Sequence, residues 1–97
     1  MAGYIVLGKY TREGLGELEE MLEIIKKHRE HCKARNVRLI GTWCTMGEYD
    51  YVSVYDAPDD KTMAQVVLGS AQGGLVATQT MRAFSEEEFA EIVAGIE

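Results

Sequence analysis

Seven side chains that can bind or react with a small molecule lie near the predicted ends of strands in the first half of the chain. They offer an ammonium, two hydroxyls, two carboxylates, a phenol and an indole, and they belong to Lys9, Thr11, Trp43, Thr45, Glu48, Tyr49 and Asp50. In a ligand site, Lys9 would neutralise a carboxylate on a small polar or aromatic molecule. Asp50 or Glu48 would then move a proton as an acid or a base, with Lys9 beside it.

The same residues also have a structural interpretation. Asp50 follows the tight turn Met46-Gly47-Glu48, and a Gly-x-x-Asp sequence usually serves its turn because the carboxylate caps backbone N–H groups. Tyr49 would then pack against a neighbouring loop, and Lys9 would pair with Asp50. At the level of sequence both interpretations stay open.

Only a folded sheet brings these residues together. Apolar, β-branched and aromatic runs predict strands at 4–9, 37–45, 49–55 and 75–83, and helical spacing predicts helices at 15–34, 59–71 and from 85 onward. The order β-α-β-β-α-β with right-handed crossovers predicts an α+β fold, a ferredoxin-like antiparallel sheet with an extra C-terminal helix. Its strands would lie in the spatial order fourth, first, third, second. Both main helices would then cover one face, and the candidate residues would meet at one edge.

Local signals mark the ends of these elements. Gly41 is predicted to form a bulge, Asn36 to end the first helix and Asp59 to cap the second. Ser85 and Glu88 are predicted to form a capping box at the start of the last helix. Apolar stripes are expected to be buried at Leu15, Leu18, Leu22 and Ile25 in the first helix and at Phe84, Phe89, Ile92, Val93 and Ile96 around the last.

The third strand alternates between two kinds of side chain. Val52 and Val54 would point to one face of the sheet, and Tyr49, Tyr51, Ser53 and Tyr55 to the other. We expect the tyrosine face to be open and to pack against the same face of a second copy, which would close a barrel between two subunits, because bare aromatic patches mark interaction surfaces. Base stacking on RNA is the competing interpretation. The formal charge of −6 and the lack of basic residues beside the tyrosines oppose it, so we predict a homo-oligomer, a dimer or higher, and no nucleic-acid partner.

His28, His31 and Cys32 can share one face of the first main helix, and His and Cys side chains suit zinc. A single helix without a second ligand-bearing segment is a weak basis for a metal site. We therefore predict no metal and no cofactor. The alternative is that Cys32 and His28 lie under the edge of the sheet while His31 is exposed.

The length of 97 residues predicts one domain over residues 1–97, and the apolar share of 46% is ordinary for a globular chain. Two cysteines are too few for a disulfide framework, so free thiols are expected. No N-terminal targeting pattern and no apolar run near the ~20 residues of a membrane span are present. We expect a cytoplasmic protein without a membrane partner.

Four segments taken together resemble the GYD domain family. They are Thr11-x-x-Gly14, the block 45–50, the strand exit 56–60, and Thr78-x-Thr80-x-Arg82-Ala83-Phe84-Ser85. The family is named for a Gly-x-Tyr-Asp signature, which Gly47, Tyr49 and Asp50 match. The resemblance covers almost the whole chain and implies a ferredoxin-like fold related to dimeric α/β-barrel proteins, with no established activity. The long helix with its histidines and cysteine departs from the family pattern.

These observations favour a small homo-oligomeric module that binds a small molecule or assembles with itself. The alternative is a cofactor-free acid–base enzyme of the dimeric α/β-barrel group, similar to an isomerase, decarboxylase or monooxygenase. The two differ in what surrounds the candidate residues. A ligand or enzyme site needs Lys9, Trp43, Tyr49 and Asp50 to line an enclosed pocket, whereas the structural interpretation uses them in turn hydrogen bonds and subunit packing.

Overall fold

The computed structural model describes all 97 residues and contains four strands, four α-helices and one 3-10 helix. Their bounds are β1 Ala2–Tyr10, α1 Arg12–Leu15, η1 Leu18–Glu20, α2 Met21–Ala34, β2 Arg38–Cys44, β3 Tyr51–Ala57, α3 Asp60–Ala71, β4 Val76–Ala83 and α4 Glu86–Ala94. The element order agrees with the predicted β-α-β-β-α-β chain and its extra C-terminal helix.

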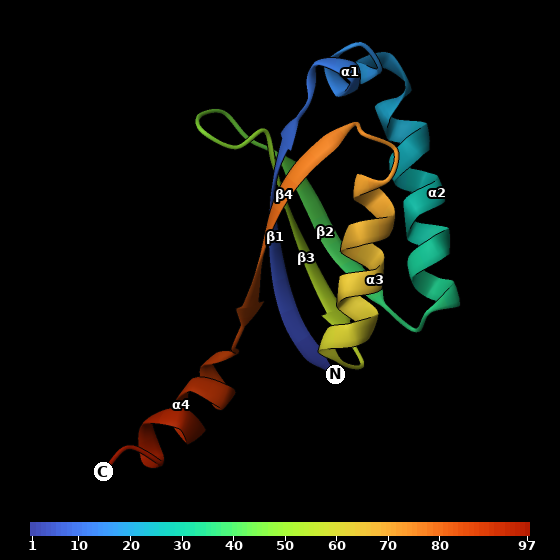
Figure 1. Cartoon of the computed structure of the whole chain (residues 1–97). Helices are drawn as coiled ribbons and strands as arrows, with labels where there is room; N and C mark the ends of the chain where they lie inside the picture. Colours follow the sequence, from blue (N-terminus) through green and yellow to red (C-terminus); the bar gives the residue numbers. More distant parts are fainter.

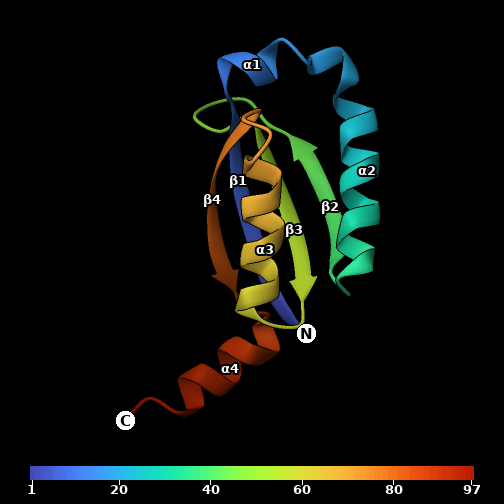
Figure 2. The ribbon, with the colours of Figure 1, turned by 45° about the vertical axis from the view of Figure 1, so that its right-hand side comes forward.

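The four strands form one antiparallel sheet in the order β2-β3-β1-β4, which confirms the predicted topology. Helices α2 and α3 lie side by side on one face of this sheet, and the other face is bare (Figure 1). The turned view in Figure 2 shows the same two layers. The molecule measures 51 × 32 × 18 Å, so it is a flat two-layer body that leaves much of the sheet open.

Most of the local signals act as predicted. The Asp59 side chain accepts a hydrogen bond from the Thr62 N–H at 2.8 Å and caps α3, and Ser85 with Glu88 forms the expected capping box on α4. Asn36 takes a positive φ of 58° just after α2, and the β2–β3 register shifts between Leu39 and Gly41. These residues fix the element ends because each provides a hydrogen bond or a backbone conformation that few other residues can.

The single helix predicted over residues 15–34 is wrong in its first third. Thr11 caps the short helix α1, which ends at Gly16, and Glu17 then takes a φ of −111° and ψ of 15° that interrupts helical geometry. The stripe expected to be buried there is exposed: Leu15, Leu18 and Leu22 keep 55%, 49% and 82% of their surface. Of the four stripe residues only Ile25 of α2 is half-buried and faces the space between the helices and the sheet.

The core lies between the helices and one face of the sheet. Strand residues Tyr4, Val6, Leu39, Tyr55 and Ala57 pack there against Cys32 of α2 and Met63 and Val66 of α3, with Val37 at the end of the layer. This arrangement corrects the predicted faces of β3. Ser53 and Tyr55 are buried and Tyr51 is half-buried on the helix-covered face, so they do not form the open face.

The open face carries a different set of side chains. The register pairs Ile5 of the central strand β1 with Val54 of β3 and Met81 of β4, so these three side chains lie next to one another on that face. Leu7, Val52 and Trp43 extend the same apolar surface along β1, β3 and β2. Trp43 keeps 55% of its surface exposed, and a Cβ on Gly41 would come within 2.7 Å of its ring, so the six-membered ring of the indole lies close over that glycine.

Helix α4 extends beyond the end of the sheet, away from α2 and α3 (Figure 1). The stripe predicted to be buried along it is exposed, with Phe89 at 61% and Ile92 at 43% of their surfaces. The prediction of burial is therefore wrong for a single chain, because the body of the domain offers α4 no surface to pack on. Only 12 of the 97 residues are buried, so the lone chain leaves two apolar surfaces in water. None of its helices is both long and apolar enough to cross a bilayer.

Candidate functional site

Asp50, the last residue of the Gly-x-Tyr-Asp signature, is used to join the β2–β3 hairpin to the end of β1. Its carboxylate accepts a hydrogen bond from the backbone N–H of Tyr10 at 2.9 Å. Its own N–H donates to the carbonyl of Gly8 at 2.8 Å, and its carbonyl accepts from the N–H of Thr45 at 2.9 Å. These three hydrogen bonds to backbone groups favour the structural interpretation of Asp50. Its carboxylate caps an N–H group of β1, whereas the prediction had placed its partners within the turn.

The two threonines of the predicted site are also engaged by the backbone. The Thr11 hydroxyl donates to the Gly74 carbonyl at 2.6 Å and accepts from the Gly14 N–H at 3.1 Å, so it joins the β1–α1 corner to the loop before β4. A Cβ on Gly14 would lie 2.0 Å from the Leu75 carbonyl oxygen, which explains the Thr-x-x-Gly pattern. Thr45 donates to the carbonyl of Tyr49 at 2.7 Å inside the hairpin loop.

The remaining residues of the predicted site lie around one end of the open face. Tyr49 donates to the side-chain oxygen of Gln79 at 2.8 Å, and the ammonium of Lys9 lies 5.4 Å from the centre of the Tyr49 ring. Glu48 is exposed at the tip of the hairpin, and Trp43 lies on the open face. None of the seven candidates lines the cavity of about 510 Å³ or the cavity of about 360 Å³ described below. The structure does not gather them into one enclosed pocket.

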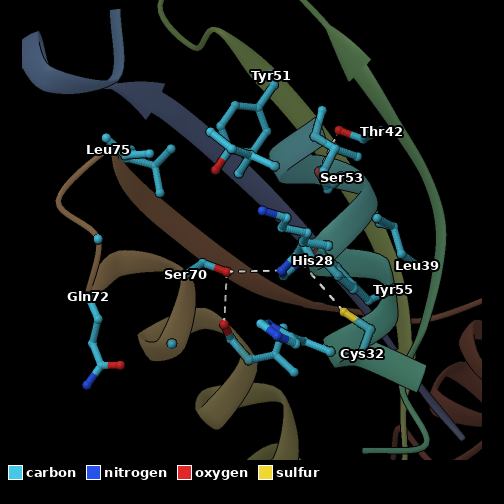
Figure 3. A pocket seen from close by; sticks show the side chains of 18 of the residues that line it. His28, Cys32, Leu39, Thr42, Tyr51, Ser53, Tyr55, Ser70, Gln72 and Leu75 are labelled. Atoms are coloured by element: carbon cyan, nitrogen blue, oxygen red, sulfur yellow. Dashed lines mark hydrogen bonds between the residues drawn. The ribbon is translucent and has the colours of Figure 1, made fainter. Parts of the chain in front are cut away.

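A cavity of about 510 Å³ instead lies between α2, α3 and the covered face of the sheet (Figure 3). We call it the helix–sheet groove. Its polar side chains come from the sheet, from α2 and from α3, and include Thr42, Tyr51, Ser53, Tyr55, His28 and Ser70. A second cavity of about 360 Å³ lies beside the start of β2 and is lined by residues such as Arg29, Lys33 and Arg38.

A chain of hydrogen bonds crosses the groove from β3 to α3. Nε2 of His28 lies 2.8 Å from the hydroxyl of Tyr55, and Nδ1 lies 3.4 Å from the hydroxyl of Ser70. The Ser70 hydroxyl donates to the Val66 carbonyl at 3.0 Å, one turn earlier in α3. Figure 3 shows His28 between Ser70 and the sheet. One imidazole thus connects α2 to both of the other walls of the groove.

The donor and the acceptor in each of these hydrogen bonds can be assigned from the proton or lone pair that each side chain has not already used. Ser70 gives its proton to Val66, so its oxygen accepts from Nδ1–H of His28, and Nε2 then accepts from the hydroxyl of Tyr55. Burial lowers the pKa of His28, and electrostatic repulsion from the neighbouring His31 and Arg29 acts in the same direction. Burial also raises the pKa of Tyr55, which keeps its proton. The imidazole is therefore neutral at pH 7.

Cys32 lies next to this histidine without forming a nucleophilic pair with it. Its sulfur is 3.6 Å from Nε2, whose lone pair is already directed at Tyr55. The cysteine is 1% exposed, and burial raises the pKa of its thiol. It acts as a core residue, and Cys44, on β2, is a free and exposed thiol. No group of three or more His, Cys, Asp and Glu side chains is arranged to hold a metal ion.

Tyr51 forms the floor of the other end of the groove. A Cβ on Gly8 would lie 2.0 Å from its ring, so the ring crosses β1 in the space that only glycine leaves free. Its centroid is 5.6 Å from that of Tyr10. Burial raises the pKa of Tyr51 to about 12, so the phenol is neutral, and its hydroxyl forms no hydrogen bond with another protein group. This hydroxyl can bond to a molecule inside the groove.

Sequence reasoning identified part of the groove and missed the rest. The expectation that Cys32 and His28 lie under the sheet and that His31 is exposed is confirmed. Tyr51 and Tyr55 were expected on the opposite face, and Ser70 carried no signal because it is an ordinary residue in the last turn of α3. The i, i+4 spacing of His28 and Cys32 was the one pattern that pointed to this wall.

A family model described as the GYD domain matches residues 4–93. The chain is 34% identical over 84 residues to a Thermus thermophilus protein named "Glutamine synthetase and cystathionine beta-lyase binding protein". The match covers 86% of this chain and 88% of that protein. The name states that the relative binds two enzymes.

Two solved structures share the architecture. The crystal structure of MtbAldR superposes with a TM-score of 0.69 at 12% identity, over 88% of this chain and 52% of that one. The crystal structure of FFRP-DM1 gives 0.62 at 19% identity, over 87% of this chain and 100% of that one. At these identities the likeness shows the fold alone, and it agrees with the predicted ferredoxin-like domain.

Proposed function

The chain belongs to the GYD domain family, and we propose that it is a small homo-oligomeric binding module that assembles through the open face of its sheet. The observation that carries this proposal is the apolar surface around Ile5, Val54 and Met81, which the chain itself leaves uncovered. The relative named for binding two enzymes supports a binding role over a catalytic one. We extend protein binding, but no particular partner, to this chain.

A second copy is the occupant that fits the open face. Antiparallel sheets with one bare apolar face commonly pack face to face, about 10 Å apart. The middle of the face carries no charge, with Lys9 near one end and Asp56 and its cross-strand partner Arg38 near the other. A twofold axis would place each of these charges toward the rim of the contact, and the apolar patch would meet its own copy. Full burial of one Ile, Leu, Val or Met side chain contributes about 1.5–3 kcal/mol.

The predicted ligand residues take a new place in this proposal. Lys9, Trp43 and Tyr49 lie on or beside the open face, so we assign them to the contact between copies or its rim. The acid–base alternative needs a free carboxylate, and the Asp50 carboxylate accepts the Tyr10 N–H instead. Glu48 is exposed at the hairpin tip, where no cavity encloses a substrate. These contacts support binding and assembly for this region.

The experiment compares two neighbouring residues on the edge strand β4. Met81 pairs with Ile5 on the open face, and Thr80 pairs with Val6 on the other face; both are exposed in one chain. Met81→Lys should lower the sedimenting mass or weaken association at least tenfold, because it buries a charge in an apolar contact. Thr80→Lys adds the same charge to the same strand and should leave association unchanged. Equal sedimenting masses and equal association of the two variants would contradict assembly through the open face.

A further inference from the structure

The helix–sheet groove has a charge pattern opposite to that of the whole chain. The chain has 16 acidic and 10 basic residues, yet the groove is lined by Lys27 and Arg35 and by no Asp or Glu. Lys27, His31 and Arg35 follow one another at intervals of four along α2, so they form a row on one edge of the helix. All three side chains are exposed, which places the charges of Lys27 and Arg35 at the mouth rather than in the depth of the groove.

The opposite wall and the floor have no charge. Across the mouth, α3 and the loop after it offer the neutral amides of Gln65 and Gln72. The inside of the groove is lined by aliphatic side chains and by rings. The aliphatic residues include Ile24, Ile25, Val66 and Leu75, and the rings are those of Tyr10, Tyr51, Tyr55 and His28. Apolar and aromatic walls with a few directed polar groups are typical of small-molecule sites, and about 510 Å³ lies in their usual range of roughly 300–1,000 Å³.

From this arrangement we infer that the groove binds a small aromatic carboxylate. The ring lies among the tyrosines and aliphatic side chains, and the carboxylate faces the Lys27–His31–Arg35 row at the mouth. The Tyr51 hydroxyl, which has no protein partner, bonds to a second polar group of the ligand. Aromatic pairs add about 0.5–1.5 kcal/mol beyond buried area, whereas exposed ion pairs add little, so the ring supplies affinity and the row supplies selectivity. This site is separate from the open face and does not depend on assembly.

One position tests occupancy of the groove without disturbing the fold. Gly69 lines the groove from α3, and a Cβ placed on it would meet no other atom within 4 Å. Gly69→Leu therefore projects a side chain into the space that the ligand would fill, and it also replaces a poor helix former with a good one. Ala64→Leu, on an exposed position of the same helix outside the groove, is the matched control.

The experiment titrates the full-length protein with naphthoate and with its uncharged amide, naphthamide, and follows backbone amide NMR signals. We expect saturable shifts at groove residues such as His28 and Ser70, and binding of the amide about fivefold weaker than that of the acid. Lys27→Ala/Arg35→Ala should weaken naphthoate by a similar factor and leave naphthamide unchanged. Lys26→Ala/Lys33→Ala removes two charges from the same helix outside the groove and should alter neither. Gly69→Leu should abolish both titrations, and Ala64→Leu should not.

Three outcomes would overturn the inference. One is the absence of saturable shifts in the groove. The second is a set of shifts on open-face residues such as Ile5, which Gly69→Leu would leave in place. The third is equal affinity for acid and amide. The titration measures ligand binding in the groove, and sedimentation measures assembly through the open face. A negative result in one experiment therefore does not contradict the other proposal.

Discussion

Nε2 of His28 on α2 lies 2.8 Å from the hydroxyl of Tyr55 on β3, although the two residues are 27 positions apart. This contact places the tyrosine face of β3 under the helices and leaves the valine face bare. Both proposals depend on it. The groove contains the imidazole and the phenol, and the open face is apolar because the tyrosines point away from it.

The His28 contact makes stability depend on pH in a predictable direction. Its pKa in the folded chain is lowered, so below an unfolded-state value of about 6.5 the unfolded chain takes up a proton that the folded chain does not. The free energy of unfolding should therefore fall as pH drops through about 6.5, by at most about 1.4 kcal/mol per pH unit, and level off below the folded pKa. Urea unfolding between about pH 7.5 and about pH 5.5 measures it.

Two variants on the same helix separate this effect from general acid sensitivity. His28→Gln should remove most of the decline over that interval. His31→Gln should retain it, because His31 is exposed. If His28→Gln and wild-type protein show the same decline, the burial of a neutral His28 is contradicted.

The carboxylate of Asp50 should matter for stability and not for catalysis. Asp50→Ala leaves the Tyr10 N–H without its partner, which should cost about 1–3 kcal/mol of unfolding free energy. Glu48→Ala, two residues earlier at the exposed hairpin tip, should change it by less than about 0.5 kcal/mol. Equal losses in the two variants, measured by urea unfolding, would speak against the hydrogen bonds of Asp50 as the reason for its place in the signature.

The ring of Tyr51 should make Gly8 intolerant of any side chain. Gly8→Ala places a methyl group where the ring lies, and overpacking of this kind costs about 1–3 kcal/mol. In a Tyr51→Ser background the space is free, so the same substitution should cost much less. A double-mutant cycle by urea unfolding checks the coupling. Identical costs in the two backgrounds would mean that the ring does not cross β1 at this point.

Topology and element ends could be predicted because they depend on local chemistry. Asp59, Ser85 and Glu88 cap helices through side chains within three residues of their targets, and Gly41 marks the bulge in β2. The strand order follows from the sequence of elements and the handedness of the crossovers. These features need no knowledge of which surfaces the helices cover.

The covered face of β3 could not be predicted from alternation alone. A period of two separates Tyr51 and Tyr55 from Val52 and Val54, but it does not say which pair meets the helices. Which face the helices cover depends on Gly8, which leaves space for the Tyr51 ring, and on His28, which accepts a hydrogen bond from the Tyr55 hydroxyl. Both lie on other elements, so the signal exists only in three dimensions. The groove was missed for the same reason.

The apolar stripes at the two ends of the chain were misjudged for a different reason. Helical spacing predicts which residues share a face, but not that another surface lies against that face. Phe89 and Ile92 share a face of α4, yet α4 extends away from the sheet (Figure 1). A single chain cannot supply the missing surface.

The mass of the unmodified protein in solution tests the central claim most directly. One chain has a mass of 10.8 kDa, and assembly through the open face predicts a sedimentation-equilibrium mass of at least twice that value at concentrations where the Met81→Lys variant approaches the single-chain mass. A mass of 10.8 kDa for the unmodified protein at every concentration would contradict the account, because the apolar face around Ile5, Val54 and Met81 would then remain in water.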